Sequence, residues 1–218
     1  MIAKNVELIE YSKKVDFGNC ITHALGAVLS VGAMLAMLIK AQDIRHTLSA
    51  VIYGAALIAV YTVSAAYHGL KSGEAKRIAR LIDHSTVPVL IAGTATPCAL
   101  ITLYEISAAH SIFVLLLGWL CTLFGFFSKI FFFEKLKAVT IAVYIVSCLA
   151  MILSVFPIIG EINATAFRGI LLGNAAYLLG AVFCGRGRKR EVLHVVFHIF
   201  VLAAAAIHFY VIYNYMFI

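Results

Sequence analysis

Apolar and charged residues are arranged along this chain in long blocks rather than in short periods. Seven stretches contain no Asp, Glu, Lys or Arg, and the shortest, 169–185, has 17 residues. A membrane-spanning helix needs about 20 mostly apolar residues, within a range of about 17–25. The pattern therefore predicts seven transmembrane helices, over 20–39, 46–70, 84–104, 106–128, 138–160, 169–185 and 192–218.

The polar segments between these stretches are short. Only Glu105 separates the third stretch from the fourth, which requires a tight turn around Tyr104–His110. Residues 1–18 are polar and precede the first span, and no other polar segment is long enough to form a second domain. We predict one all-α domain over 1–218, a seven-helix membrane bundle with a polar N-terminal tail at 1–18.

Composition supports a membrane protein. Hydrophobic residues make up 63% of the chain and charged residues 12%, and the mean hydropathy is +1.02. Soluble domains have about 45–50% apolar and about 25% charged residues, so a soluble, secreted disulfide-rich or disordered chain is excluded. The cysteines are odd in number and show no C-x-x-C spacing, which is typical of apolar packing residues rather than disulfides; they are Cys20, Cys98, Cys121, Cys148 and Cys184.

The basic residues are unevenly distributed between the polar segments. The N-terminal tail and the even-numbered loops carry 14 of the 17 Lys and Arg residues, and the remaining segments carry 3. Cytoplasmic loops collect Lys and Arg, so we expect a cytoplasmic N-terminus and an outside C-terminus. The net charge of +7 then reflects topology and attraction to anionic inner-leaflet lipid, and no nucleic-acid partner is expected.

Ionisable residues inside membrane helices are costly and therefore indicate function. Ser64 and His68 lie at the end of the second span, Asp83 at the start of the third, and His194 and His198 at the start of the seventh. Residues four apart share a helix face. With the predicted topology, all five residues lie at a similar depth just below the inner surface, where the bundle brings them together.

Three histidines with a fourth position open to water are the ligand pattern of a catalytic zinc site. Zinc lowers the pKa of its bound water to about 7, which makes a nucleophile available at neutral pH. In this interpretation His68, His194 and His198 bind Zn²⁺, Asp83 holds the water and accepts its proton, and Ser64 donates a supporting hydrogen bond.

Simpler explanations exist for each residue alone. An H-x-x-x-H pair can arise by chance, histidines at helix ends can extend toward headgroups, and Asp83 can neutralise Arg80 or Lys76. The similar predicted depth of the five residues in the membrane favours the metal site over these alternatives. The H-E-x-x-H signature is absent because residue 195 is Val, which disfavours a zincin-like protease.

The other histidines have different expected roles. His23 opens the first span at the same inner level and is a candidate to support the site. The rest are expected to pack in helices or to lie in outer loops: His84, His208, His46 and His110.

The set Ser64-x-x-x-His68, Asp83 and His194-x-x-x-His198 resembles the hemolysin III family. That family is the bacterial branch of the progestin and adiponectin receptor superfamily, within a wider group of membrane hydrolases that includes alkaline ceramidases. The segments 16–26, 81–85 and 91–97 are also similar to motifs of the family. Two positions depart from it, because Asp16 stands where Glu is more frequent and Ala95 where Tyr is frequent.

The resemblance implies a seven-helix protein of the bacterial plasma membrane, with zinc bound by His68, His194 and His198. It implies that Asp83 holds or activates the zinc-bound water, with Ser64 close by. For the eukaryotic relatives it suggests hydrolysis of a lipid amide, and for the bacterial branch the name suggests cytolysis. Roles in membrane lipid homeostasis are also implied.

Three functions remain open from the sequence. The leading one is a zinc-dependent hydrolase of a membrane lipid amide or ester, working from the phospholipid bilayer. The second is a receptor or sensor in which zinc is structural. The third is a pore-forming hemolysin, which should show a polar stripe through several spans; the sequence shows no such stripe, because the outer halves of the spans are mostly Ala, Leu, Ile, Val and Phe. The lipid and the oligomeric state are left open.

The charge asymmetry gives a topological prediction. A reporter fused after Arg190 should be cytoplasmic, and one fused after Ile218 should be outside, because a single span separates them. Alkaline phosphatase and fluorescent-protein fusions at both sites measure this. Both reporters on the same side would contradict the seven-span topology.

Overall fold

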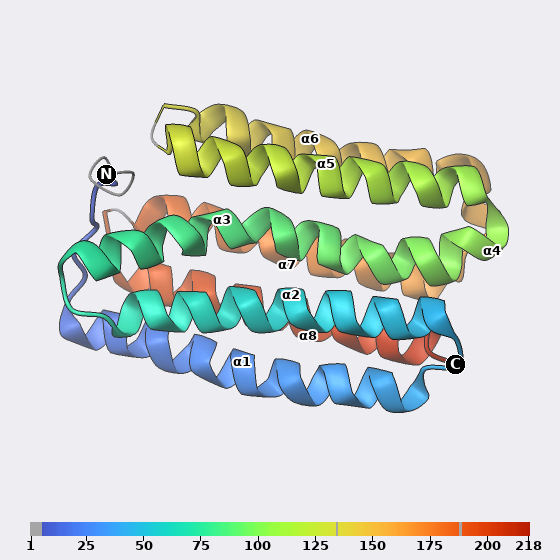
Figure 1. The fold of residues 1–218 in the computed structure, drawn as a ribbon, viewed down its shortest axis with the longest axis horizontal. Coiled ribbons are helices and arrows are strands. Elements are labelled where there is room, and N and C mark those ends of the chain that lie inside the picture. Colours follow the sequence, from blue (N-terminus) through green and yellow to red (C-terminus); the bar gives the residue numbers. More distant parts are fainter. Residues whose placement is uncertain (1–5, 134, 188) are drawn as a thin grey trace.

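The computed structural model describes residues 6–133, 135–187 and 189–218, and they form a bundle of long helices (Figure 1). No strand occurs among these residues. A π-helical segment η2 (Cys98–Leu103) joins α3 to α4, and a 3₁₀ helix η3 (Phe156–Glu161) follows α6. The α-helices are α1 (Lys13–Lys40), α2 (Ile44–Gly69), α3 (Glu74–Pro97), α4 (Tyr104–Ile106), α5 (Ala108–Phe132), α6 (Lys137–Ser154), α7 (Ala164–Gly187) and α8 (Val192–Tyr215).

Six helical stretches in the described part of the chain are long and apolar enough to cross a membrane, which makes this an all-helical, multi-pass membrane protein. They correspond to α1, α2, α3 continued through α4, α5, α7 and α8. The fifth predicted span, 138–160, forms a shorter apolar helix over Ala138–Ser154 and continues as η3. Pro157 lies in the first turn of η3, and because proline has no N–H it cannot make the α-helical hydrogen bond to the Leu153 carbonyl. The seventh crossing and the sidedness of the bundle stay predictions.

Helix ends extend past the charge-free stretches. Helix α1 begins at Lys13 and α3 at Glu74, so the last six residues of the predicted polar tail are helical and Asp83 lies well inside α3. Charged side chains are tolerated at these positions because the positions lie at helix ends, where water and lipid headgroups are near. The predicted turn at Tyr104–His110 is confirmed, since α4 ends at Ile106 and α5 begins at Ala108.

A side-chain cap fixes the start of α2. The Asp43 carboxylate accepts hydrogen bonds from the His46 backbone N–H at 2.9 Å and from the His46 ring at 2.7 Å. These bonds, the backbone one first, lower the pKa of Asp43 to about 2. The cap satisfies an N–H group that the first turn of a helix leaves without a partner.

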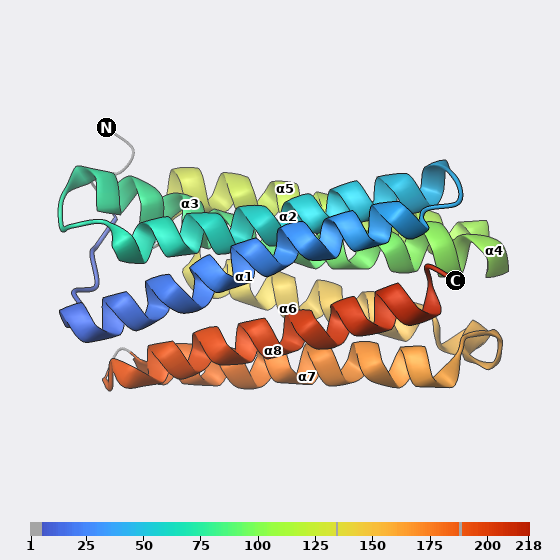
Figure 2. The same cartoon turned by 90° about the horizontal axis from the view of Figure 1, so that it is seen from below.

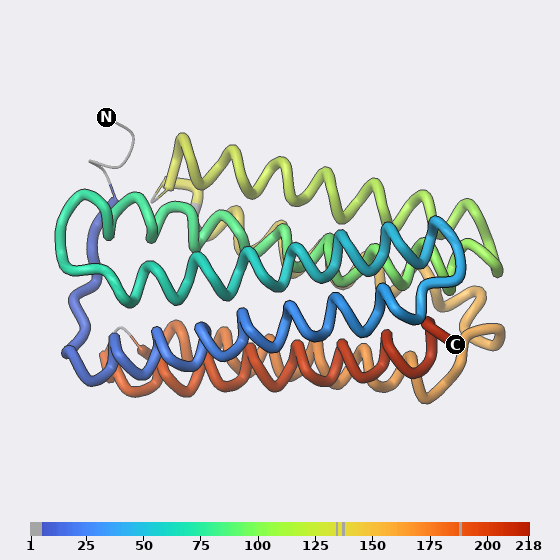
Figure 3. The backbone as a smooth tube through the Cα atoms, turned by 60° about the horizontal axis from the view of Figure 1, so that its bottom comes forward, coloured from blue at the N-terminus to red at the C-terminus, as the bar shows by residue number. Residues whose placement is uncertain are grey.

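The helix order places the ends that carry the predicted site at one end of the bundle. The first turns of α1, α3 and α8 and the last turn of α2 lie together at the left in Figure 1, and Figure 3 shows the same grouping in the backbone trace. Helix α1 lies between α2 and α8, and α7 lies along α8, as the view from below shows (Figure 2). An apolar core fills the space between α2 and α8 and includes Tyr53, Tyr61, Val201 and Ile212.

Helices α2 and α3 are packed tightly together at a glycine. A methyl group on Gly93 would lie 2.5 Å from Cβ of Ala56, which is 3% exposed. Small residues at such contacts let membrane helices pack closely, because lipid-embedded helices associate through van der Waals packing. This contact sets the spacing between the helix that carries Ser64 and His68 and the helix that carries Asp83.

The glycine contact predicts a difference between two otherwise equivalent substitutions. Gly93→Ala should destabilise the protein by about 1–3 kcal/mol, because the added methyl overpacks the α2–α3 contact. Gly32→Ala, also in a helix but with no atom within 4 Å of the new methyl, should be neutral or should stabilise by up to about 1 kcal/mol. Thermal unfolding in detergent measures both. Equal melting temperatures for the two variants would contradict close packing at Gly93.

Candidate metal centre

Three histidines from two helices meet at this end of the bundle. One ligand nitrogen from each of His68, His194 and His198 can be chosen so that all three lie within 4.8 Å of one another. The ring centroids are 4.9 Å apart for His68–His198 and His194–His198, and 5.3 Å apart for His68–His194. The side chains are buried, with 3%, 9% and 1% exposure for His68, His194 and His198. The cluster could therefore hold a metal ion, as the sequence predicts.

A carboxylate orients His68. The Nδ1 atom of His68 donates a hydrogen bond to Oδ1 of Asp16 in α1 at 2.9 Å. The second carboxylate oxygen of Asp16 accepts a hydrogen bond from Nζ of Lys76 at 2.6 Å. With the proton on Nδ1, Nε2 keeps its lone pair, and this buried atom has no hydrogen-bond partner among the described residues. A histidine whose second nitrogen donates to a carboxylate is the usual arrangement of a metal ligand, because the carboxylate fixes the tautomer and raises ligand basicity.

The role of Asp16 was not predicted from the sequence, where this residue was noted only as a departure from a motif. A signal was available, because Asp16, Asn19 and His23 follow at i, i+3 and i+7 and so lie on one face of a helix. Asn19 and His23 are buried on that face. The face points toward the cluster, and α1 thus contributes to a site that the sequence assigned to α2, α3 and α8.

Aromatic and sulfur groups surround the two histidines of α8. The Nδ1 atom of His194 lies 4.0 Å from Sγ of Cys184 in α7. The ring of Tyr11, in the segment before α1, stacks on the His194 ring with centroids 4.9 Å apart. His23 stacks on His198 with centroids 3.8 Å apart. Burial raises the pKa of Tyr11 well above its usual range, so this phenol stays neutral against the imidazole.

The structure also places Ser64 and Asp83 as a pair. Ser64 lies one turn before His68 in α2 and is 3% exposed. Its hydroxyl lies close enough to the Asp83 carboxyl group in α3 for the two groups to interact. Asp83 is not part of the three-histidine group. The five residues predicted from the sequence thus form a histidine cluster and a hydroxyl–carboxyl pair that share helix α2.

The remaining histidines lie elsewhere in the bundle. Nε2 of His208 donates to the Ile170 carbonyl at 3.0 Å, more than two helical turns along α8 from His198. His84 packs against the ring of Phe133. The other two take part in local hydrogen bonds at helix starts, His46 with Asp43 and His110 with Ser107.

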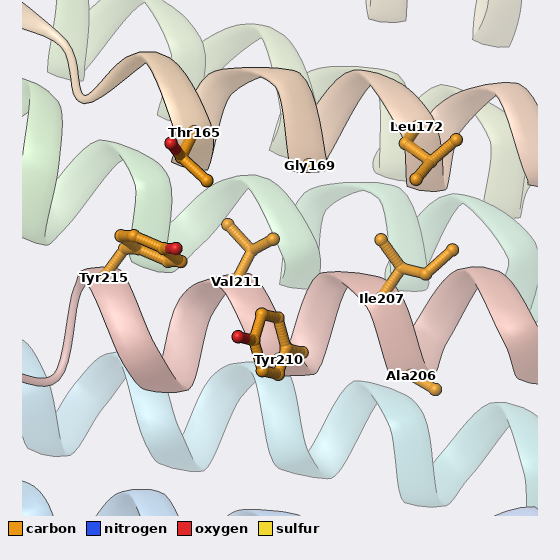
Figure 4. Close-up of a pocket in the computed structure, with 8 residues that line it drawn as sticks. All are labelled: Thr165, Gly169, Leu172, Ala206, Ile207, Tyr210, Val211 and Tyr215. Carbon is orange, nitrogen blue, oxygen red and sulfur yellow. The ribbon is translucent and has the colours of Figure 1, made fainter.

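An apolar groove of about 430 Å³ lies between α7 and α8, toward the end of α8 opposite the histidine cluster (Figure 4). Side chains of Leu172, Ile207 and Val211 form much of its wall. It contains none of the polar residues of the cluster, so it contributes nothing to the chemistry of the site.

The donor set suits a metal ion. Buried imidazole nitrogens without partners cost free energy, and both Nε2 of His68 and Nδ1 of His198 are in this state among the described residues. A bound metal ion removes that cost at the nitrogens it binds. Neutral imidazole ligands suit zinc, copper, iron and nickel rather than magnesium or calcium.

Comparison with known proteins identifies the family of this chain. The family described as "Haemolysin-III related" matches residues 11–209. The chain is 29% identical to Hemolysin-3 of Bacillus cereus, over 96% of this chain and 95% of that protein. It is 30% identical to the Hemolysin-3 homolog of Bacillus subtilis, with 92% and 93% coverage. It is 27% identical to the human Monocyte to macrophage differentiation factor, with 91% and 83% coverage.

The Asp16–His68 hydrogen bond generates a prediction about metal affinity. Asp16→Asn should weaken metal binding about 10- to 100-fold, because loss of the carboxylate leaves His68 less basic and less firmly oriented. His68→Ala should lose most of the metal, and His208→Ala should lose none. Metal content by mass spectrometry and competition with a chelator measure these effects. Unchanged affinity in Asp16→Asn would show that Asp16 does not support the ligand.

Proposed function

Given that this chain belongs to the haemolysin-III-related family, we propose that it is a zinc-dependent hydrolase of a membrane lipid amide or ester. The observation that supports this most directly is the buried group of His68, His194 and His198, to which the Ser64–Asp83 pair is linked through helix α2. Three imidazole ligands leave one coordination position for water or substrate, which is the arrangement of catalytic rather than structural zinc.

His68, His194 and His198 would hold the zinc, with Asp16 fixing His68. When bound, zinc supplies a Lewis acid and lowers the pKa of a coordinated water to about 7. The chain's own contribution is a low-dielectric pocket and a firmly oriented ligand set. Tyr11 and His23 add to this by stacking on His194 and His198 and limiting ring rotation.

Asp83 is proposed as the general base and Ser64 as the residue that orients it. Asp83 accepts a proton from the attacking water, whose oxygen bonds to the acyl carbon of the lipid. The acyl C–N or C–O bond then breaks, and the leaving nitrogen or oxygen takes the proton that Asp83 accepted. The products are a fatty acid and an amine or alcohol. Ser64 donates to one carboxylate oxygen, so that the other faces the water.

We also propose how the site is oriented in the membrane. The protein is a single membrane domain over 1–218, with its N-terminus in the cytoplasm and its C-terminus outside the bacterial plasma membrane. The cluster then faces the inner leaflet, where a lipid enters sideways between helices. The partners are bilayer lipids, and no nucleic-acid partner is proposed.

A zinc-stabilised sensor is the second candidate, and one observation favours it. All three histidines are at most 9% exposed, and Tyr11 covers the ring of His194. A closed site of this kind suits a metal that fixes helix packing while lipid binding shifts it. The names of the Bacillus relatives support a cytolytic role as a third candidate.

Asp83→Asn separates catalysis from structure. The substitution should keep the zinc, because Asp83 is not a ligand, but should lower hydrolysis by about 10²–10⁴-fold, because Asn cannot act as a base. Ser64→Ala should have a milder effect on rate. Release of free fatty acid from amide and ester lipids in reconstituted membranes is the measurement, with zinc content determined on the same samples.

The controls decide between the candidates. Loss of zinc in Asp83→Asn would make Asp83 a ligand and the site a closed, structural one. Full zinc occupancy in the wild type without turnover of any lipid in the panel would favour the sensor.

A further inference from the structure

Arg80 in α3 is buried, and two of its three guanidinium nitrogens have no hydrogen-bond partner among the described residues. Its side chain is 2% exposed, and its Nε and Nη1 atoms are buried with no hydrogen bond to any described residue. No described carboxylate lies within 4.0 Å of the guanidinium group. Its Cζ atom lies 5.4 Å from the centroid of the Phe133 ring. A guanidinium group in this state is costly, because a buried charge and its N–H groups need partners.

The nearby acidic groups already have other partners. Both oxygens of Asp16 are used, one by His68 and one by Lys76. Asp83 pairs with the Ser64 hydroxyl, and Arg80 acts on it only through space. Lys76 is itself 5% exposed, so two buried cations lie on neighbouring turns of α3. The region therefore carries positive charge that the described carboxylates contact only in part.

Geometry selects the kind of group that would satisfy Arg80. A guanidinium group binds carboxylate and phosphate groups through two parallel N–H···O bonds, and Arg is preferred over Lys for this. Arg80 lies three residues before Asp83, about 4.5 Å along the helix axis, toward the end of α3 that begins at Glu74. In the predicted topology this is the headgroup side of Asp83. In a phospholipid the phosphate lies a few bonds from the first acyl linkage, on the headgroup side.

We propose that Arg80 is the receptor for the phosphate group of a phospholipid, held so that the first acyl linkage of the lipid reaches Asp83 and the three histidines. The substrate class of the site is then an anionic or zwitterionic phospholipid rather than a neutral lipid such as a ceramide or diacylglycerol. This specificity rests on the proposed function, but phosphate recognition itself does not require turnover.

The cover over Arg80 is compatible with entry of a lipid. Phe133 packs with Leu81 and with Val6 of the segment before α1 in a small apolar cluster. That segment forms no regular secondary structure over residues 6–12. A short irregular segment is displaced at lower cost than a helix, because few backbone hydrogen bonds hold it.

The test compares binding of two lipids with identical acyl chains, a short-chain phosphatidate and the matching diacylglycerol, to the purified zinc-loaded protein in detergent. Wild type should prefer the phosphatidate. Arg80→Gln should weaken phosphatidate binding about 10- to 100-fold, as expected for loss of charged hydrogen bonds, and should leave diacylglycerol binding unchanged. Arg80→Lys should recover part of the affinity. Arg77→Gln, one turn earlier on the same helix at an exposed position, is the matched control and should behave as wild type.

Several results would overturn the proposal. One is equal phosphatidate affinity in wild type and Arg80→Gln. Others are equal affinity of wild type for both lipids, and tighter binding of a fatty acid of the same chain length than of phosphatidate. Inorganic phosphate that competes at the concentration of the phosphatidate would assign the site to free phosphate instead of a lipid. If the Arg80→Gln protein does not fold, the phosphatidate affinity of Arg80→Lys is compared with that of wild type instead. An Arg80→Lys protein that binds phosphatidate as tightly as wild type would contradict bidentate recognition.

The experiments distinguish failure of the proposed hydrolase function from failure of phosphate recognition by Arg80. A protein that prefers phosphatidate through Arg80, holds zinc and hydrolyses no lipid would contradict the hydrolase while leaving phosphate recognition intact. A protein that hydrolyses ceramide and diacylglycerol as well as phospholipids, with rates unaffected by Arg80→Gln, would contradict only the role of Arg80.

Discussion

The structure depends on one hydrogen bond, between the Asp16 carboxylate of α1 and Nδ1 of His68 in α2. Polar groups at membrane depth have little water to bind, so they must be satisfied by one another. One carboxylate oxygen of Asp16 accepts a hydrogen bond from His68, and the other accepts one from Lys76 of α3. One carboxylate therefore ties three helices together and leaves Nε2 of His68 free for a metal. The same bond accounts for a charged residue inside the first membrane helix.

Close helix packing is the second requirement, since a site made from four helices needs fixed distances between them. Gly93 brings α2 and α3 together, which lets Ser64 meet Asp83 across that interface. Helix α8 supplies both His194 and His198, and α1 presses His23 against the second of them. Without a strong hydrophobic driving force between helices in lipid, such packing contacts determine the geometry. The site is thus as rigid as the bundle that carries it.

The charged residues near the histidines lie in a definite order along α3. The cluster itself is formed of imidazoles, and Lys76, Arg80 and Asp83 follow one another along α3 from its start. Lys76 is neutralised by Asp16, whereas Arg80 has no such partner among the described residues. A lipid with a phosphate near Arg80 and an acyl linkage near Asp83 matches this order of groups. In the function that we propose, catalysis and lipid choice both depend on this arrangement along α3.

The sequence by itself determined that this is a helical, multi-pass membrane protein, because long charge-free stretches can be stable in no other environment. It also determined the histidine cluster, since an i, i+4 pair on α8 and a histidine at the matching depth of α2 leave little freedom. It did not fix the helix ends, because Lys13 and Glu74 are helical despite their charge. The role of Asp16 and the isolation of Arg80 were decided by the tertiary structure alone. Both depend on distances between helices that are far apart in the chain, and no local pattern encodes those distances.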